Sequence, residues 1–425
     1  MQVKEEVIVV HGNQTLAGEV RVSGAKNSAL KLMAASILAK GVTTLHNIPK
    51  ITDIDVMSEV LEFLGAKVSR CEHTLTIDTS DVYIWQTPYS LVSKMRASIS
   101  ILGPLIGRFG KAKVAMPGGC QIGARKIDMH LVGLHALGVD FKNDHGQIFA
   151  MTPDGLVGNH IVLEFPSVGA TENTLMSAIV AKGKTVIDNA ASEPEIVDLA
   201  NMLNDMGAKI TGAGTPRLEI EGVDRGSLTP CTHTCVGDRI EAGTFLAGAA
   251  LTGGPIKVCG VNPDHLGVAL SKLEDFGCKV DRGEDYIYLS RDAELEPVDI
   301  QTLPYPGFPT DLQAQFMLIA NYSKGISVVT ENVFENRFMF ASELMRMGAD
   351  ITIDDHHAVV HGPRKLSGAP VSATDLRAGG ALVLAGIMAD GYTTVHSIRH
   401  IDRGYENYCE KLCQLGAKVT RELEE

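Results

Sequence analysis

Apolar and polar positions follow one short phrase that recurs six times along the chain. Each copy consists of a large apolar residue, Gly, a small or β-branched residue, a charged residue and an aliphatic or aromatic residue. The copies are 64–68, 137–141, 206–210, 276–280, 347–351 and 415–419. Their glycines stand 73, 69, 70, 71 and 68 positions apart. This regularity indicates an internal repeat of about seventy residues.

Each phrase is expected to join the end of a helix to the start of a strand. Before the glycine, apolar residues recur at helical spacing, as at Leu199, Met202, Leu203 and Met206. A glycine directly after such a run is the usual C-terminal residue of a helix. A second glycine recurs earlier in each repeat, ahead of β-branched runs that predict strands. Examples of these runs are 42–45, 184–187 and 326–329. One repeat is therefore predicted to be a βαβαββ-like unit.

The first helix of each repeat is apolar almost all round, as in 30–38 and 245–251. Helices of this kind lie inside a protein, packed against one another and enclosed by sheets. Six such units exceed one core of normal size, which favours two domains of three repeats each. The predicted fold class is α/β (α+β), a two-domain inside-out α/β barrel of six repeats with buried helices enclosed by sheets.

The expected domain boundaries follow from two segments. A polar, proline-bearing stretch at 229–234 separates the third repeat from the fourth, and an apolar strand at 6–10 precedes the first repeat. If that strand completes the sixth repeat, the chain crosses between the domains twice. We therefore expect one domain at 22–232, which carries a catalytic loop at 116–125, and another made of 1–21 and 233–425. A cleft between two domains is a natural ligand site, and the active site is expected there.

Composition limits the protein class. Apolar residues make up 45% of the chain and charged residues 21%, as in an ordinary soluble globular protein. The sequence has no run of 18 apolar residues that would predict a membrane span, and its start lacks the core of a signal peptide. A net charge of −13 disfavours nucleic acid or an anionic membrane as a partner. We therefore expect a cytoplasmic protein.

The eight cysteines lack the tight pairs that zinc sites use. Cys409 and Cys413 are four residues apart on a predicted helix and are expected in the core. Cys231 and Cys235 have no second ligand pair nearby in the sequence and are expected in the linker. We predict no metal, no cofactor and, in a cytosolic protein, no disulfide.

Cationic residues recur where helices begin. The set is Lys26, Arg96, Arg125, Arg239, Arg337, Arg377 and Arg403. A positive charge at a helix N-terminus costs about 0.3–1 kcal/mol unless an anion offsets it. Equivalent places in two similar domains point to a cleft that holds several negative groups. The alternatives are solvated surface positions, or ion pairs with Asp238, Glu335, Asp375 and Asp402.

The second repeat contains an insertion at 116–125 that the other repeats lack. It holds three glycines and one proline around Cys120. This composition predicts a mobile loop of the kind that covers ligand sites. An exposed thiol near cations can act as a nucleophile or a proton donor. Cys120 is therefore a candidate catalytic residue.

Six segments together resemble one family. They are 24–27, 96–98, 117–125, 167–171, 309–313 and 403–406. In these segments, which span nearly the whole chain, the sequence resembles the UDP-N-acetylglucosamine 1-carboxyvinyltransferase family of enolpyruvyl transferases. The resemblance implies a two-domain fold of three βαβαββ-like units per domain. It also implies the first committed step of peptidoglycan synthesis, and hence a role in cell wall biogenesis, cell shape and cell division.

The implied reaction is an addition followed by an elimination. The 3-hydroxyl of UDP-N-acetylglucosamine adds to C2 of phosphoenolpyruvate, and phosphate leaves from a tetrahedral intermediate. By resemblance, Cys120 donates a proton to C3 and forms a covalent adduct, also with fosfomycin-type inhibitors. Asp311 is implied to take the proton of the sugar hydroxyl. From the residues alone, Asp311 and Asp375 are not distinguishable, because both follow a Thr and suit a helix cap.

The other site residues are likewise implied by resemblance. Lys26 and Arg403 would also serve catalysis. Phosphoenolpyruvate would be bound by Lys26, Asn27, Arg96, Arg125, Arg377 and Arg403. UDP-N-acetylglucosamine would be bound by Asn27, Arg96, Arg125, Lys126, Ile127, Asp128, Met129, Ser167, Val168, Gly169, Asp311, Val333 and Phe334. Two positions depart from the family pattern, since Lys126 replaces a proline and Phe165 stands where a lysine is common.

Two other functions remain open from the sequence. One is 5-enolpyruvylshikimate-3-phosphate synthase, which shares the expected fold and the phosphoenolpyruvate substrate but has no cysteine loop. The other is a catalytically silent paralogue that binds the nucleotide sugar and regulates its pathway. For the transferase itself we expect a monomer.

Overall fold

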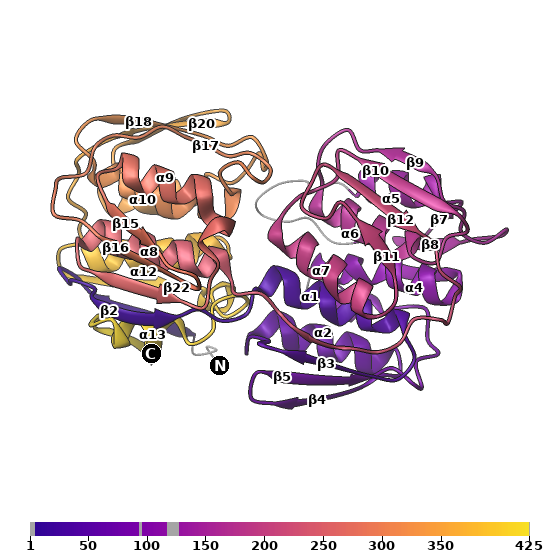
Figure 1. The fold of residues 1–425 in the computed structure, drawn as a ribbon. Helices are drawn as coiled ribbons and strands as arrows, with labels where there is room; N and C mark the ends of the chain where they lie inside the picture. The colour runs from indigo at the N-terminus through magenta and orange to yellow at the C-terminus, as the bar shows by residue number, and fades with distance from the viewer. Residues whose placement is uncertain (1–4, 93–95, 117–126, 425) are drawn as a thin grey trace. The chain divides into compact units, whose positions relative to one another are not determined.

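The computed structural model describes residues 5–92, 96–116 and 127–424. Within them the chain forms two compact units. The N-terminal unit comprises the described residues of 24–236, and the C-terminal unit comprises 5–23 and 237–424. The first is drawn mostly in indigo to magenta in Figure 1 and the second mostly in orange to yellow. The chain therefore crosses between the units at 23–24 and at 236–237.

The N-terminal unit contains three sheets, one for each repeat. Their strand orders are β13 (Thr232–Thr234), β3 (Val42–His46), β5 (Thr74–Asp78), β4 (Lys67–Cys71); then β6 (Lys111–Ala115), β8 (Gln147–Met151), β7 (Asp140–Asp144); then β11 (Lys209–Thr211), β12 (Arg217–Glu221), β10 (Lys184–Asp188), β9 (His160–Val162). The most buried helices are α1 (Lys26–Ala35), α4 (Leu102–Phe109) and α6 (Val168–Ala178). The helices α2 (Thr52–Phe63), α5 (Asp128–Ala136) and α7 (Pro194–Asp205) precede the repeat glycines.

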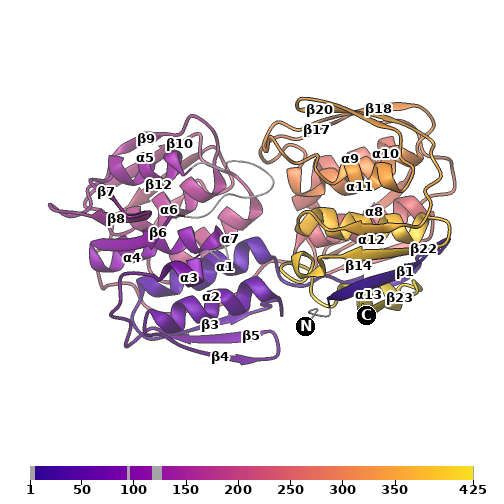
Figure 2. The same ribbon diagram turned by 180° about the vertical axis from the view of Figure 1, so that it is seen from behind.

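The C-terminal unit repeats this arrangement. Its sheets are β21 (Pro370–Ser372), β22 (Tyr392–His396), β1 (Glu6–His11), β23 (Val419–Leu423); then β15 (Lys279–Arg282), β16 (Tyr286–Ser290), β14 (Ile256–Cys259), β2 (Gly18–Arg21); then β17 (Ile300–Gln301), β18 (Ile326–Thr330), β20 (His357–His361), β19 (Ile351–Asp354). The most buried helices are α8 (Arg239–Thr252), α10 (Gln313–Tyr322) and α12 (Leu376–Met388), and the others include α9 (Gly267–Asp275), α11 (Ala341–Arg346) and α13 (Tyr408–Gln414). Figure 2 shows the same elements from behind.

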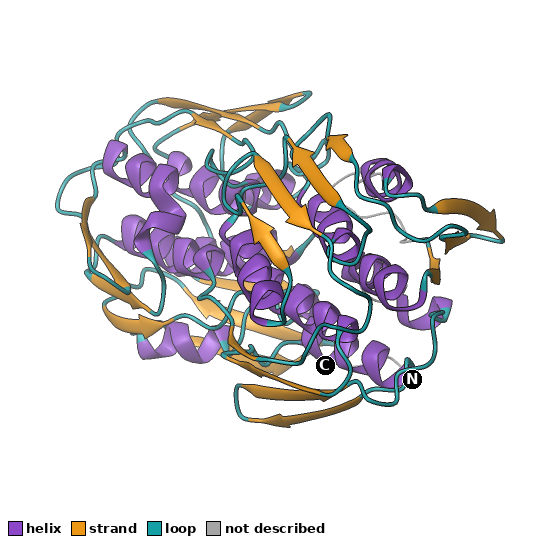
Figure 3. Ribbon diagram, turned by 45° about the vertical axis from the view of Figure 1, so that its right-hand side comes forward, coloured by secondary structure: helices purple, strands orange, loops and turns teal. Residues whose placement is uncertain are grey.

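In each unit the strands lie outside and the apolar helices inside, as Figure 3 shows. Every residue of α8 from Arg239 to Leu251 is buried. In the C-terminal unit α8, α10 and α12 pack against one another. The predicted fold class, with helices enclosed by sheets, is confirmed.

The repeat glycines end helices as predicted. The helices α2, α5, α7, α9, α11 and α13 each end two residues before the glycine of the phrase. All six glycines have positive φ, from +93° to +107°. Residues with a side chain rarely adopt this backbone conformation, so glycine is favoured at each position.

Three strands belong to sheets built mainly from distant parts of the chain. β1 pairs with β22 and β23, so the apolar strand at the start of the chain completes the sixth repeat. β2 runs parallel to β14, and β13 runs parallel to β3. The polar stretch expected to link the domains thus contains β13, which is part of the first repeat's sheet. None of the described helices has the length and apolarity needed to cross a membrane.

Candidate active site

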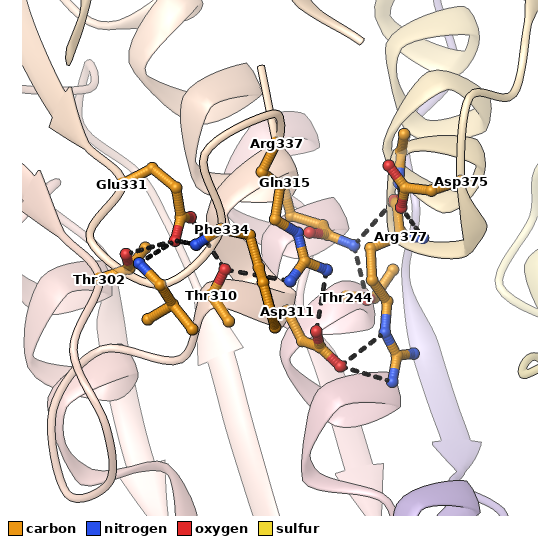
Figure 4. Close-up of polar contacts among 12 residues, drawn as sticks. Thr244, Thr302, Thr310, Asp311, Gln315, Glu331, Phe334, Arg337, Asp375 and Arg377 are labelled. Atoms are coloured by element: carbon orange, nitrogen blue, oxygen red, sulfur yellow. Dashed lines mark hydrogen bonds and ion pairs between the residues drawn. The ribbon is translucent and has the colours of Figure 1, made fainter. Parts of the chain in front are cut away.

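Asp311 lies between two arginines in the C-terminal unit. It belongs to the 3-10 helix η4 (Thr310–Leu312), which leads into α10. Arg337 donates from Nη2 to Oδ1 of Asp311 at 2.8 Å. Arg377 donates from Nε to Oδ2 at 3.2 Å, and its Nη2 lies 3.1 Å from the same oxygen. Figure 4 shows the three side chains converging from η4, from the segment before α11 and from α12. One carboxylate is therefore held by two cations.

The surroundings of Asp311 and Asp375 differ, although the sequence does not separate them. Asp375 is the N-cap of α12, and its side chain accepts hydrogen bonds from the backbone N–H groups of Arg377 and Ala378. Asp238 caps α8 in the same way. Asp311 is not a cap, because Pro309 holds the N-cap position of η4. Its carboxylate is aimed at guanidinium groups instead.

The cations of this group are buried. Arg337 and Arg377 are 5% and 3% exposed, and Arg239, the first residue of α8, is 8% exposed. Burial by itself would lower the pKa of Arg377, but the charge of Asp311 and the contact with Tyr405 raise it. The guanidinium also lies over the ring of Tyr405, with Cζ 5.4 Å from the ring centroid. Arg377 is thus a permanent buried charge rather than a solvated surface residue.

Val333 and Phe334 form a turn close to this group. The guanidinium of Arg337 lies 5.5 Å from the centroid of the Phe334 ring. Both turn residues are half-buried. The turn begins two residues after Glu331, whose carboxylate accepts hydrogen bonds from the backbone N–H groups of Val333 and Phe334 at 2.8 and 3.0 Å. The residues implied to border the sugar are therefore fixed beside the partner of Asp311.

Arg403 is half-buried in the segment between the 3-10 helix η5 (Ile398–His400) and α13. Burial lowers the pKa of His400, and the charges of Arg399 and Arg403 lower it further. The positive charge of Arg403 therefore acts on His400, at the end of η5. Asp402, one of the acids available for pairing, instead contacts Arg421.

Lys26 opens α1 in the N-terminal unit and is buried. Its Nζ lies 2.8 Å from Oδ2 of Asp53, which belongs to the first turn of α2 and is 2% exposed. The neighbouring Asn27 is half-buried, and its side-chain amide makes no hydrogen bond to other described residues. The ion pair holds the ammonium group at the helix N-terminus, where it could not remain buried without a counter-charge.

Ser167, Val168 and Gly169 form the start of α6. Ser167 is the N-cap, and its hydroxyl accepts a hydrogen bond from the N–H of Ala170 at 3.4 Å. All three residues are half-buried. A side chain at Gly169 would clash with the imidazole of His130, since a Cβ there would lie 2.7 Å from Cε1. The N–H groups at the start of a helix suit a negatively charged group.

Some predicted residues lie outside the described part of the chain. These are Cys120, Arg125 and Lys126. Arg96 begins the 3-10 helix η2 (Arg96–Ile101), but its side chain is not described. Ile127 is the N-cap of α5, Asp128 is its exposed first residue and Met129 is half-buried.

The structure brings Asp311 together with Arg377, and joins Phe334 to them through Arg337. Arg337 was recognised only as one of the recurring cations, and its contact with Asp311 carried no sequence signal. Asp53 and Glu331 were also missed. The sequence does not single out Asp53 strongly, because acidic residues are common in the first turn of a helix.

The described residues contain no group of three or more His, Cys, Asp or Glu side chains arranged for a metal ion. A cavity of about 200 Å³ lies beside Asp311's segment and is lined by Arg239, His265, Tyr305 and Pro309 among others. Arg239 is one of the recurring cations, but none of the residues implied to bind the two substrates lines this cavity.

The chain is similar to enolpyruvyl transferases over its whole length. The profile of the family described as EPSP synthase (3-phosphoshikimate 1-carboxyvinyltransferase) matches residues 10–412. The UDP-N-acetylglucosamine 1-carboxyvinyltransferase 2 of Carboxydothermus hydrogenoformans is 52% identical over 418 residues, which cover 98% of this chain and 99% of that protein. The UDP-N-acetylglucosamine 1-carboxyvinyltransferase of Corynebacterium jeikeium is 50% identical over 417 residues, which cover 98% and 99%.

Solved structures agree in fold. The enolpyruvyl transferase NikO from Streptomyces tendae has a TM-score of 0.90 and 28% identity, with full coverage of both chains. EPSP synthase from Acinetobacter baumannii has a TM-score of 0.75 and 16% identity, and covers 98% of this chain and 100% of its own. The latter likeness shows the fold alone.

Proposed function

The chain belongs to the UDP-N-acetylglucosamine 1-carboxyvinyltransferases of the enolpyruvyl transferase family, and we propose that Asp311 is the base of its transfer reaction. The activity is transfer of the enolpyruvyl group of phosphoenolpyruvate to the 3-hydroxyl of UDP-N-acetylglucosamine, with release of phosphate, in peptidoglycan synthesis. Relatives at about 50% identity carry this name, which disfavours the shikimate enzyme as the alternative.

The observation that carries the proposal is the pairing of Asp311 with Arg337 and Arg377. Two guanidinium groups stabilise the ionised carboxylate, and a base must be ionised to accept a proton. The proton of the sugar hydroxyl passes to Asp311 while the hydroxyl oxygen forms a bond to C2 of phosphoenolpyruvate. Cys120 donates a proton to C3 in the same addition. Loss of a C3 proton and breakage of the bond from C2 to the phosphate oxygen then give the product and phosphate.

Cationic groups of both units are proposed to bind the anionic substrates. Phosphoenolpyruvate carries a phosphate and a carboxylate, whose binding we assign to Lys26, Asn27, Arg96, Arg125, Arg377 and Arg403. Buried, fixed charges of this kind stabilise charge that develops in the transition state. The burial of Lys26 and Arg377 supports the assignment. The proposal requires residues of both units to act on one pair of bound substrates.

The nucleotide sugar is proposed to bind through backbone and turn residues. The N–H groups at the start of α6 suit the diphosphate, which Ser167, Val168 and Gly169 would contact. The sugar would lie against Val333 and Phe334, with Asn27 donating or accepting a hydrogen bond near its acetamido group. The segment from Arg125 to Met129 would contact the nucleotide.

The test compares two aspartates. We expect Asp311→Asn to lower kcat by about 10²- to 10⁴-fold, since general-base catalysis contributes that much. Asp375→Asn is the matched control, because Asn caps a helix as well as Asp. Its phosphate release should stay near the wild-type rate. Equal loss in both variants would show that the aspartates act only on structure. No release by the wild-type protein with either UDP-N-acetylglucosamine or shikimate 3-phosphate would favour the silent paralogue.

We further propose a cytoplasmic monomer that needs no cofactor and is alkylated by fosfomycin-type inhibitors at Cys120. Sedimentation of the active protein tests whether it is a monomer, and activity that falls on dilution would contradict that proposal.

A further inference from the structure

Glu331 is a buried carboxylate at the end of β18 that the proposed mechanism does not use. It is 3% exposed. Its Oε1 accepts hydrogen bonds from the Thr302 hydroxyl at 2.9 Å and from the backbone of Val333 and Phe334. Its Oε2 accepts from the Thr310 hydroxyl at 2.8 Å. Among the described residues it forms no direct ion pair. Four hydrogen bonds therefore compensate the burial of its charge.

The Thr310 hydroxyl connects Glu331 to Asp311. A hydroxyl has one proton, which here is donated to Glu331, so its lone pairs remain available as acceptors. Arg337 donates to that oxygen from Nη1 at 3.0 Å. The same guanidinium donates from Nη2 to Asp311. The planar guanidinium cannot turn toward one partner without moving from the other. Figure 4 shows this path from Glu331 through Thr310 and Arg337 to Asp311.

We infer that Glu331 is a positioning residue for the transfer. It fixes the turn of Val333 and Phe334 and, through Thr310 and Arg337, the orientation of the Asp311 carboxylate. One side chain thus sets both the surface proposed to border the sugar and the group proposed to take its proton. This inference rests on the proposed roles of Asp311 and of the Val333–Phe334 turn.

Glu331→Gln isolates the inference because it keeps the shape of the side chain. An amide has only one oxygen, whereas all four contacts of Glu331 are donors to it. If the amide nitrogen faces Thr310, it donates to the Thr310 oxygen, and the hydroxyl proton must then point toward Arg337. Two donors then face each other, and the hydrogen bond from Nη1 of Arg337 is lost. If the nitrogen faces the turn, the N–H groups of Val333 and Phe334 meet another donor. Either orientation therefore breaks one of two links, the path through Thr310 to Asp311 or the hydrogen bonds to the turn.

Two threonine variants separate the path to Asp311 from the other hydrogen bonds of Glu331. Thr310→Val removes the link to Arg337 and leaves the turn of Val333 and Phe334 held by Oε1. Thr302→Val removes a donor on the other side of Glu331 and leaves the path to Asp311 intact. Thr302 is buried, so its variant also reports the cost of losing a buried hydroxyl.

Activity is measured as phosphate release with phosphoenolpyruvate and UDP-N-acetylglucosamine. Loss of a hydrogen bond to a charged group corresponds to about 10- to 100-fold in rate, so we expect Glu331→Gln and Thr310→Val to lower kcat by roughly that factor. Thr302→Val should lower the thermal midpoint but retain kcat within about threefold. A loss of kcat in Thr302→Val equal to that in Thr310→Val would overturn the inference, as would normal kcat in Glu331→Gln.

A double variant shows whether Glu331 acts through Asp311. If it does, Glu331→Gln added to Asp311→Asn should slow the reaction by less than about threefold, since groups acting as a unit are not additive. A full 10- to 100-fold further loss would contradict a path through Asp311. Failure of the proposed function has a different signature, because Asp311→Asn alone would then leave kcat unchanged.

Discussion

Nε2 of His233 lies 2.8 Å from Oδ1 of Asp198, and the two side chains are only 11% and 3% exposed. Asp198 also accepts hydrogen bonds from the Ser28 hydroxyl and from the backbone N–H of Val236 at 3.3 Å. Nδ1 of His233 lies 3.6 Å from Asp205. A single carboxylate on α7 therefore ties the start of α1 to the segment where the chain leaves the N-terminal unit.

This contact predicts a pH-dependent stability. Burial by itself would lower the pKa of His233, but the hydrogen bonds and charges of Asp198 and Asp205 raise it. Folding then favours the protonated imidazole. The stabilisation is complete below the unfolded pKa of about 6.5 and is lost as pH rises through the folded pKa. We expect His233→Gln to lower the thermal midpoint by roughly 3–6 °C at pH 5.5 and by less at pH 9.

His160 provides the control for that measurement. It lies 2.6 Å from Asp188, but its side chain is 59% exposed. Exposed pairs contribute little, so His160→Gln should shift the midpoint by about 1 °C or less at either pH. Equal losses for His233→Gln at pH 5.5 and pH 9 would show that the charge of His233 does not stabilise the fold.

A second buried carboxylate, Glu241, holds the other crossing of the chain. It is 2% exposed and accepts from the backbone N–H of Ser23 at 2.7 Å. Lys411 lies 2.6 Å from it and also donates to the Ser23 hydroxyl. Burial raises the pKa of Glu241 and Lys411 opposes that rise. Lys411→Met should therefore destabilise the C-terminal unit by about 3 kcal/mol at pH 8, because it leaves a buried charge unpaired.

The pH dependence of Lys411→Met follows from the same pKa. A carboxyl whose folded pKa is raised destabilises the fold when ionised, so the loss should shrink as pH falls toward the unfolded value of about 4.3. Glu241→Gln in the Lys411→Met background should restore much of the stability at pH 8. Urea unfolding of the four proteins of this cycle measures the coupling. Additive losses would mean that the two side chains do not stabilise each other.

Much of the fold could be predicted because each repeat has a glycine where a helix ends. Each phrase places glycine two residues after a helix, where φ is positive. By contrast, β13 has three polar residues and forms only because β3 supplies a parallel partner from far away in the chain. Its pattern resembles that of a linker, so local sequence could not reveal it.

The types of residue in the candidate site could be predicted from the sequence, but their contact partners could not. Asp311 and Asp375 each follow a threonine, and only the direction of the side chain separates a cap from a carboxylate held by arginines. Lys26 and Asp53 lie on different helices, and an acid in the first turn of α2 needs no special explanation. Such pairs depend on tertiary packing, which no short pattern encodes.

The preference for glycine at positive φ can be tested at a position where an added side chain meets no steric clash. Gly391 has a φ of +90°, and a Cβ there would meet nothing within 4 Å. Gly391→Ala should therefore cost about 1–2 kcal/mol from backbone strain alone. Gly267 has equally open space but a helical φ of −42°, so Gly267→Ala should be neutral or stabilising by about 0.5 kcal/mol. Both glycines belong to the C-terminal unit, and urea unfolding compares them directly. Equal effects would refute a conformational role for Gly391.

The cysteines predict where an epoxide reacts. A thiol must ionise to attack, and burial raises the pKa of Cys231, Cys278 and Cys409 to about 11. At neutral pH their thiolate fraction is roughly one in ten thousand. Cys71 and Cys413 are exposed and are the competitors to consider, so the expectation that Cys413 lies in the core is wrong. We expect fosfomycin to modify Cys120, which lies outside the described residues, because the proposed site surrounds it with cations that favour the thiolate.

Peptide mapping of the alkylated protein checks this expectation. Cys120→Ser should abolish the adduct, whereas a Cys71→Ser, Cys413→Ser double variant should react at the wild-type rate, since those thiols lie outside the proposed site. Phosphoenolpyruvate should slow the modification if it occupies the same cationic group, and shikimate 3-phosphate should slow it less. An adduct found first on Cys71 or Cys413 would mean that simple exposure, rather than the electrostatics of the proposed site, decides which thiol reacts.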